Sequence, residues 1–549
     1  MKRLKRDTES GHVAVPEERP KRSRQNLLVA ITAVIVLAAG IAGTYFYRSG
    51  KKEAATHPLT VPVPPPPPGL PVATATPSLA VLPFHDLSGQ KKGEQWGIGI
   101  ADAIISRLAT LKNLTVRPTN SVLKYANGAE DPVQAARELQ VTSVLAGTYQ
   151  RIGGVVRVSV QLVDNGATRW AKRYDLQGRD MLSFQDDVAQ KVVDGLSVQL
   201  SGAEQESLKA PSTSSTEAYN LLLQARASWG DFFINSKRES LQRSEQMAKR
   251  ALDADPNFVD AFAILAQAYS MDATNFEEGG PQNLRLAEQA ARRAVALDPR
   301  SYEANLALGV VYGEQGKIAD SLRLLRDAVR AAPNSAAAWK HLGYTYHYAG
   351  LTDQAEAAFR RGRDLDPSLP QPYWMHGRML LYQGKAHEAE LEVRQALARY
   401  PDQYKLLTFL ADFLYYQGQI DQAEQAAARA LQSRGAEGDP EPMLIAGFVY
   451  ASRGQRDKIN PRLFRYKPEE IIDGDTAEWI GAVYALLGEK QSALAWLRRT
   501  VEVGNHNYPW FQRDKNWDKL RDDPEFKRIM TEVKGYWKKY NEEFGQPIT

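Results

Sequence analysis

The 549-residue sequence predicts a multidomain fold: a single transmembrane helix, a mixed α/β (α+β) domain, and an all-α solenoid of helical repeats. Three observations support this prediction. Residues 27–47 form an uncharged apolar run, residues 77–203 alternate strand-like and helix-like segments, and prolines then recur every 34 residues. Because one core rarely grows beyond about 250–300 residues, a chain of this length is expected to divide into several folded units.

The apolar run, LLVAITAVIVLAAGIAGTYFY, would span about 30 Å as a helix that rises ~1.5 Å per residue, which matches the hydrocarbon core of a bilayer. Eight lysines and arginines precede it within residues 1–26, and three follow it within residues 48–52. This bias predicts a bacterial inner-membrane protein with a cytoplasmic basic tail and periplasmic, extracytoplasmic domains. A cleaved signal peptide, with Gly40 and Ala42 before the cut, is the alternative.

Residues 48–76 read as a linker between the membrane helix and the first domain. They include PLTVPVPPPPPGLPV, from Pro58 to Val72, in which proline removes backbone donors and favours an extended polyproline helix. Within the membrane helix itself, Ala39 and Gly43 form a small-xxx-small pair that would allow two copies to approach as a homodimer.

The segment 77–203 predicts one compact α/β unit. Helical periodicity predicts helices at 97–111, 132–139 and 184–200. Apolar or alternating runs predict strands at 79–84, 114–116, 144–152, 155–163 and 168–174. Alternation of valine and leucine with polar residues within 155–163 predicts a sheet with one buried face and one wet face.

Four stretches of this unit, LAVLPFHDLSG, GIADAIISRLATLKNLTV, LQVTSVLAGTYQRIGGVVRVSVQLVD and RWAKRYD, resemble the TolB amino-terminal-like domain family. Domains of that family are often fused to helical repeats, as in the extracytoplasmic parts of CadC-like and cyclase-associated proteins. The resemblance implies a cytoplasmic effector before the membrane helix, such as a winged helix, a cyclase or a kinase. Residues 1–26 are too short to fold into one.

Residues 215–540 carry the repeats. The same register holds prolines at Pro299, Pro333, Pro367 and Pro401, turn glycines at Gly316, Gly350, Gly384 and Gly418, and small packing residues at Gly309, Gly343 and Gly377. This period and pattern resemble the tetratricopeptide repeat (TPR). The resemblance implies stacked helix pairs whose first helices line a concave surface.

In that register, a set of mostly aromatic and basic side chains is predicted to face the concave surface as a partner-binding groove. Its members are Lys340, Tyr344, His347, Tyr348, Trp374, Arg378, Tyr382, Lys405, Tyr415, Tyr416 and Phe448. Aromatic and arginine anchors are typical of protein interfaces, so the expected ligand is a protein or peptide with acidic and apolar side chains. The alternative is that these rings pack between neighbouring repeats.

No motif in the sequence indicates catalysis, a cofactor or a metal site, so the chain is predicted not to be an enzyme. His387 is not followed by a second histidine one helical turn later. His341, His347 and His376 lie in neighbouring repeat helices, but His341 is next to the packing residue Leu342 and His376 occupies a packing position, so no metal site is expected. His85 and Asp86 are expected to cap a turn. With 69 basic and 65 acidic residues, the chain has no global field for nucleic acid.

The sequence therefore predicts a membrane-anchored, non-catalytic interaction scaffold whose groove binds a protein or peptide outside the cytoplasm. The alternative is a sensory or signalling component that acts on a separate cytoplasmic effector, namely a transcription regulator, a cyclase or a kinase. The identity of the partner and the oligomeric state are left open by the sequence.

Overall fold

The computed structural model describes residues 76–88, 94–126, 131–176, 180–209, 213–235, 237–275, 280–367, 370–433 and 439–548. The chain divides into two units, Met1–Thr74 and Ala75–Thr549, and the structure below is that of the second. The predicted cytoplasmic tail, the membrane helix at 27–47 and nearly all of the linker lie outside the described residues. Within the described ranges, no helix combines the length and the apolar composition that crossing a bilayer requires.

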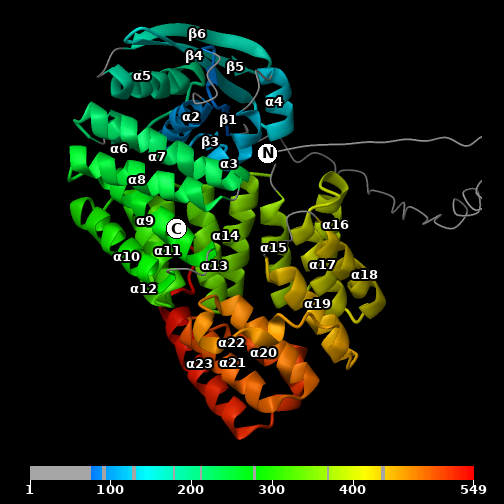
Figure 1. The fold of residues 1–549 in the computed structure, drawn as a ribbon. Coiled ribbons are helices and arrows are strands. Elements are labelled where there is room, and N and C mark those ends of the chain that lie inside the picture. The colour runs from blue at the N-terminus through cyan, green and yellow to red at the C-terminus, as the bar shows by residue number, and fades with distance from the viewer. Residues whose placement is uncertain are drawn as a thin grey trace, which may run out of the picture. The chain divides into compact units, whose positions relative to one another are not determined.

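The N-terminal part is a mixed sheet with helices packed against it (Figure 1). Its path runs β3-β1-β4-β5-β6, and β2 also pairs with β4. The pairs that β1 makes with β3 and β4 are parallel, whereas β4-β5-β6 is an antiparallel meander. The strands are β1 (Ser78–Val81), β2 (His85–Asp86), β3 (Thr115–Val116), β4 (Ser143–Ile152), β5 (Val155–Asp164) and β6 (Ala167–Leu176).

The helices of this part are close to those that the sequence predicts. They are α2 (Glu94–Leu108), α3 (Thr119–Val122), α4 (Pro132–Leu139), α5 (Asp180–Gly195) and α6 (Gly202–Lys209), with a 3-10 turn at Leu123–Tyr125. The side chain of Asp131 accepts from the backbone N–H of Val133 and so caps α4, as its position before Pro132 predicts. The short helices α3 and α6 are not predicted, because neither shows a full amphipathic period.

Side chains of β5 alternate between the two faces of the sheet. Val158, Val160 and Leu162 are buried towards α2 and α5, whereas Ser159 and Gln161 are partly exposed on the other face. Aromatic rings complete the core beneath the helices, with Trp96 of α2 in edge contact with Tyr149 of β4 at 5.0 Å. The predicted alternation of buried and wetter positions is thus seen in β5 from Val158 to Leu162, whereas β1 and the start of β4 are buried on both faces.

The C-terminal part is a succession of helix pairs that runs from the sheet to the red C-terminal helix (Figure 1). Its helices are α7 (Thr216–Asn235), α8 (Arg238–Ala254), α9 (Val259–Asn275), α10 (Gly280–Leu297), α11 (Tyr302–Glu314), α12 (Ile318–Ala331), α13 (Ala336–Tyr348), α14 (Thr352–Leu365), α15 (Gln371–Tyr382), α16 (Ala386–Arg399), α17 (Tyr404–Tyr416), α18 (Ile420–Gln432), α19 (Glu441–Ser452), α20 (Gly474–Leu487), α21 (Lys490–Glu502), α22 (Tyr508–Arg513) and α23 (Pro524–Phe544).

The periodic residues have the structural roles that their register predicts. The turn glycines, from Gly316 to Gly418, all have positive φ, between 71° and 85°, a conformation that L side chains rarely adopt. A Cβ at Gly343 would lie 2.7 Å from the Phe359 ring, so α13 and α14 approach too closely for any side chain there. After α19, 3-10 turns replace a second helix, as the proline at 461 indicates.

The sheet domain is joined to the repeats by buried hydrogen bonds. The guanidinium of Arg117, just after β3, donates to the carbonyls of Leu139 (2.8 Å) and Gln140 (2.7 Å) within the sheet domain. It also donates to the carbonyl of Leu365 at the end of α14, among the repeats. The Asn334 side chain, between α12 and α13, donates to the carbonyls of Leu111 and Leu114. These donors satisfy carbonyls that are otherwise buried, and they hold the sheet domain against the repeats. The sheet domain therefore forms one wall beside the concave surface.

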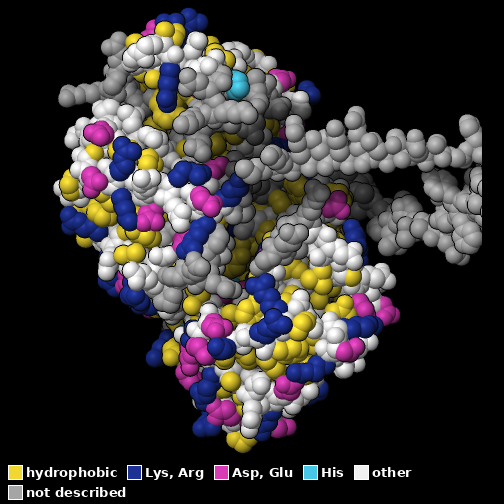
Figure 2. Space-filling view, in the orientation of Figure 1, with side chains coloured by type: hydrophobic (Ala, Val, Ile, Leu, Met, Phe, Trp, Pro, Cys, Tyr) yellow, Lys and Arg dark blue, Asp and Glu magenta, His cyan; other side chains and the backbone are white. Residues whose placement is uncertain are grey.

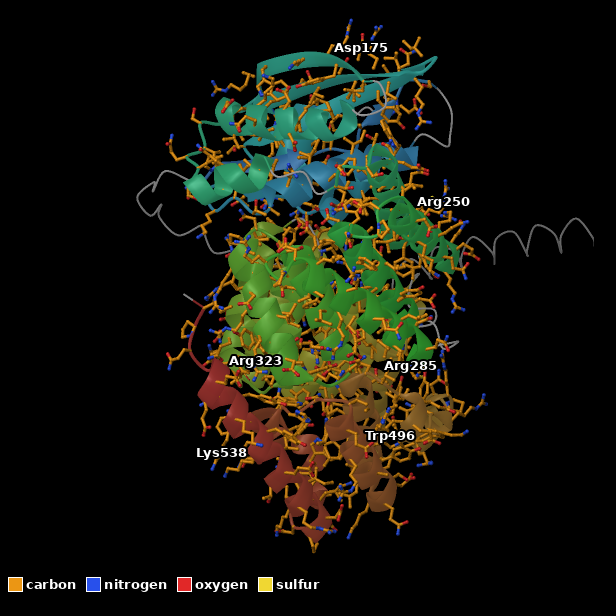
Figure 3. The ribbon with its side chains drawn as sticks, turned by 90° about the vertical axis from the view of Figure 1, so that its left-hand side faces the viewer. Asp175, Arg250, Arg285, Arg323, Trp496 and Lys538 are labelled. Carbon is orange, nitrogen blue, oxygen red and sulfur yellow. The ribbon has the colours of Figure 1, made fainter. Side chains whose placement is uncertain are left out.

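The last helix returns to the middle of the array. Arg323 of α12 pairs with Glu543 of α23, with Nε to Oε1 at 2.6 Å, and Figure 3 shows Arg323 where the end of α23 meets α12. Asp175, on the outermost strand, lies at the far end of the molecule from Lys538 (Figure 3). Charges of both signs are interspersed over the face shown in Figure 2.

Candidate functional site on the concave surface

The concave surface is formed by the first helices of the pairs, and its two halves differ. Along α13, α15 and α17, the surface is covered by the chain's own segment from Asp473 to Asn516, and we call this the filled half. Along α9, α11 and the start of α13, the surface lines a cavity of about 230 Å³ beside the sheet domain, and we call this the open half.

In the filled half, the centre is a buried ion pair. Arg378 of α15 and Asp475 of α20 are 2.8 Å apart (Nη2 to Oδ2), with Arg378 only 4% exposed. Nε2–H of His347 donates to Asp475 at 3.0 Å, since Nδ1 accepts from the Asn507 amide at 3.2 Å. Although burial raises the pKa of Asp475, Arg378 and His347 hold it well below its usual range.

Tyrosines of the first helices bind the same C-terminal segment. The hydroxyls of Tyr348, Tyr415 and Tyr416 donate to Asp473 (2.9 Å), Asn516 (2.6 Å) and Asp514 (2.8 Å), respectively. The ring of Tyr382 stacks on Trp510 with centroids 4.1 Å apart. These predicted groove residues therefore hold the chain's own C-terminal segment in this structure.

A cluster of buried carboxyls lies behind this layer. Asp412 of α17 is 5% exposed, and burial raises its pKa to about 7. Burial raises the pKa of Asp514 to about 6, and burial together with Asp514 raises that of Glu478 well above its usual range. One Asp412 oxygen has no hydrogen-bond partner among the described residues, which is consistent with a protonated carboxyl at neutral pH.

The other predicted groove residues have separate surroundings. Trp374 and Phe448 are buried and pack on Phe409 and Tyr415, while Tyr344 contacts the Phe359 ring edge-on at 5.4 Å. Lys405 pairs with Asp439 at 2.6 Å and with Glu441. Arg378 and Lys405, the expected contacts for an acidic ligand, are thus both neutralised within the chain. Lys340 alone of the predicted set lines the open half.

The open half contains more acidic than basic groups. Asp102 of α2, Asp260 of α9, and Glu303 and Glu314 of α11 line the cavity, together with Arg226 of α7 and Lys340 of α13. Arg226 pairs with Asp102 at 2.8 Å and with Asp260 at 3.6 Å, and it donates to Ser106 at 2.6 Å. Its Nε–H has no partner among the described residues. Apolar side chains, including Ile264, Leu306 and Val310, complete the lining.

Burial favours the protonated, neutral form of the two glutamates that line this cavity. Burial and the neighbouring Asp260 raise the pKa of Glu303 to about 8. Burial and Asp473 raise the pKa of Glu314 to about 7, against the effect of Lys340. Burial also lowers the pKa of Lys340 and, with Lys340 beside it, that of His341. Charge on either glutamate therefore lacks full compensation within the cavity.

A smaller cavity of about 80 Å³ continues along the same surface. It shares Pro118 and Asn120 of the sheet domain, and Ala337 and Lys340 of α13, with the larger one. Apolar side chains dominate the rest of its lining, among them Phe359, Pro372 and Met375. The two cavities thus form one path along the wall that the sheet domain provides.

The acidic residues of the open half are not among the predicted groove residues, although the register holds a signal for one of them. Glu314 lies 34 residues before Tyr348, and the same position is tyrosine again at Tyr382 and Tyr416. A glutamate at a position otherwise held by tyrosine marks a change in what that helix faces. Asp102 and Arg226 give no such signal, because their placement depends on packing between distant segments.

The histidines considered as metal ligands have other partners. His376 lies between Glu392 (2.5 Å) and Glu356 (2.9 Å), His387 is exposed on α16, and His347 is held by Asp475 and Asn507. Within the described ranges, no group of three or more metal-ligating side chains is placed to hold an ion. Asp86, at the end of β2, accepts from the backbone N–H of Ser88 at 2.7 Å and so caps the turn as expected.

Two family profiles match parts of the chain. Residues 306–370 and 375–440 match the tetratricopeptide repeat, and residues 74–194 match the second domain of HilA/YgeH-like transcriptional regulators. The α/β region is thus matched under a different family name from the TolB family that its motifs resemble. The first match covers most of α11 to α18, whose first helices line both halves of the concave surface.

Among curated proteins, the chain is similar to "Putative adenylate cyclase 3" of Rhizobium meliloti (strain 1021), at 33% identity over 195 residues. That match covers 35% of this chain and 32% of the relative, so it spans about a third of the relative's length. Among solved structures, a thermophilic TPR protein of Thermus thermophilus has 22% identity and a TM-score of 0.30, covering 36% of this chain and 99% of that chain. For pilF of Pseudomonas aeruginosa, the identity is 18%, the TM-score 0.31, and the coverages 43% and 98%. This chain therefore contains tetratricopeptide repeats, preceded by a small sheet domain.

Proposed function

We propose that this protein is a non-catalytic, membrane-anchored scaffold that binds a partner protein at the open half of its concave surface, in the extracytoplasmic space. The observation that carries the proposal is the contrast within one surface. The filled half already holds the chain's own segment, whereas the open half presents partly exposed charged and apolar side chains on consecutive first helices. Tetratricopeptide repeats use this surface to bind proteins in general.

The anchor and the location rest on the sequence. The apolar run at 27–47, with the basic residues before it, supports one membrane helix and an outward-facing C-terminal part. The TolB-like motifs support the same placement, because the resemblance implies an extracytoplasmic domain. The proposal of a non-catalytic role is supported by the lack of any phosphate-loop or zinc-protease motif in the sequence.

Site-specific photo-crosslinking in cells tests the binding site. A photoreactive phenylalanine analogue in place of Gln267, which lines the cavity, should give discrete adducts with one or a few proteins. The matched control is the same analogue in place of Gln432, an exposed glutamine on α18 outside the cavity. Adducts that form equally at both positions, or at neither, would contradict partner binding at the open half.

Cysteine labelling tests the orientation, since the chain has no cysteine of its own. In intact spheroplasts, a membrane-impermeant maleimide should label Asp327→Cys, whose native side chain is 60% exposed. It should label Ser10→Cys, in the tail, only after the membrane is permeabilised. Labelling of both variants before permeabilisation, or of neither, would rule out the proposed topology.

A second candidate is a sensory component that acts on a separate cytoplasmic effector. It is favoured by the similarity of parts of this chain to a putative adenylate cyclase and to a domain of transcriptional regulators. If it holds, replacing residues 1–26 with an unrelated basic tail should abolish a transcriptional response that deletion of the whole gene also abolishes. An unchanged transcript profile after the tail replacement would argue for the scaffold alone.

A further inference from the structure

The open half has more acidic than basic groups, and this points to the chemistry of its ligand. Four carboxyl side chains line the larger cavity against two basic ones, and Arg226 is already engaged by Asp102 and Asp260. Arg226 also interacts electrostatically with Glu303, and Lys340 with Glu314, so each of the two cations faces more than one carboxyl. A positively charged group entering the cavity would therefore gain a carboxylate contact without breaking an ion pair within the chain.

The size and shape of the two cavities limit what can enter. The larger, at about 230 Å³, is smaller than the ~300–1,000 Å³ of pockets that enclose drug-sized ligands, so it suits one long side chain. Leu306 and Val310 offer apolar surface for the aliphatic stem of lysine or arginine beneath its charged head. The smaller cavity, lined by Phe359, Pro372 and Met375, suits a small apolar side chain.

We propose that the open half binds an extended protein segment that inserts a lysine or arginine side chain among the carboxyls that line the larger cavity and a nearby small apolar side chain into the second cavity. This inference rests on the proposed function, because it names the class of partner for that same surface. It differs from the expectation of an acidic ligand, since Arg378 and Lys405 are paired within the chain.

Substitution of the two glutamates by glutamine is a suitable probe because it preserves shape. Burial raises the pKa of Glu303 to about 8 and that of Glu314 to about 7, so their protonated forms are populated near neutral pH and glutamine resembles them. The double variant E303Q/E314Q is therefore expected to fold. The matched control is D327N/E388Q, which removes two exposed carboxylates on α12 and α16, outside both cavities.

The test is selection from a displayed library of random dodecapeptides against the purified full chain. The selected peptides should share a lysine or arginine close to a small apolar residue. Their affinity for E303Q/E314Q should fall about tenfold or more, as loss of charge-assisted contacts predicts, with no change for D327N/E388Q. Ala337→Phe, at an exposed position that lines both cavities, should weaken the same peptides without altering charge.

The possible outcomes separate this inference from the proposed function. Selected peptides that are acidic, or basic peptides that bind all variants equally, would overturn the cationic ligand while leaving peptide binding in place. If no peptide binds the full chain above background, both the inference and the proposed function fail.

Discussion

The two halves of the concave surface use equivalent helix positions for different purposes. In the filled half, Tyr348, Tyr382 and Tyr416 bind or stack on the chain's own C-terminal segment. In the open half, the equivalent position is Glu314, which lines a cavity. A tyrosine can bury its ring if its hydroxyl finds one acceptor, whereas a glutamate is costly to bury without a cation. One residue per repeat thus helps to decide which part of the surface the chain covers.

The largest effect is expected from breaking the buried ion pair of the filled half. In Arg378→Met, Asp475 would lose its guanidinium partner in a buried site, which costs about 3–5 kcal/mol of unfolding free energy. Chemical denaturation would measure this loss.

Two further variants sharpen that prediction. The double variant R378M/D475N should regain part of the stability, because no uncompensated charge is left. Arg360→Met, which removes a 53% exposed arginine from a surface pair with Glu356, should cost less than about 1 kcal/mol. Equal losses for Arg378 and Arg360 would show that the filled half is not tightly closed.

An intermediate loss of stability is expected where the sheet domain borders the open half. Asn334→Ala would leave the buried carbonyls of Leu111 and Leu114 without their donor, at a cost of about 1–3 kcal/mol. Hydrogen exchange should increase around residues 109–117 and stay unchanged around residues 505–517. The control is Asn113→Ala, an exposed asparagine. If exchange rises equally in both halves, then the two halves are coupled more strongly than their contacts indicate.

The smallest effect per pH unit is a dependence of stability on pH, to which buried carboxyls of both halves contribute. Asp412 and Asp514 have folded-state pKa values of about 7 and about 6, above the unfolded value near 4. The folded state therefore binds more protons, so the unfolding free energy should fall as pH rises from about 4 to about 7, by at most about 1.4 kcal/mol per pH unit for each group. Asp475, with its lowered pKa, acts in the opposite direction only below about pH 4.

Asp412→Asn should reduce this dependence, because asparagine does not titrate. Unfolding curves at several pH values would measure the slope in the native protein and in the variant. A native protein whose stability rises between pH 4 and pH 7 would contradict the proposed protonation of the cluster.

Local patterns in the sequence predict the helix pairs well, because the residues that determine each pair lie within one repeat. The proline two residues after a second helix, the positive-φ turn glycine and the glycine beneath Phe359 all act within one repeat. The C-terminal segment that covers the filled half has no such local determinant in the sequence. Residues 503–516 show no repeat, and their contacts with Tyr382 and Tyr415 join positions about 100 to 130 residues apart. Tyr348, Tyr382, Tyr415 and Tyr416 contact the C-terminal segment, and those contacts depend on long-range packing.

The return of α23 to α12 has a consequence for how the array unfolds and is made. Residues 323 and 543 are 220 positions apart, whereas a linear array joins each repeat only to its neighbours. Contacts with the central repeats therefore oppose unfolding that begins at the C-terminal end, and we expect the repeats to unfold as one cooperative unit. During synthesis, the aromatic and charged side chains of α13 to α17 stay exposed until the final helices have emerged from the ribosome.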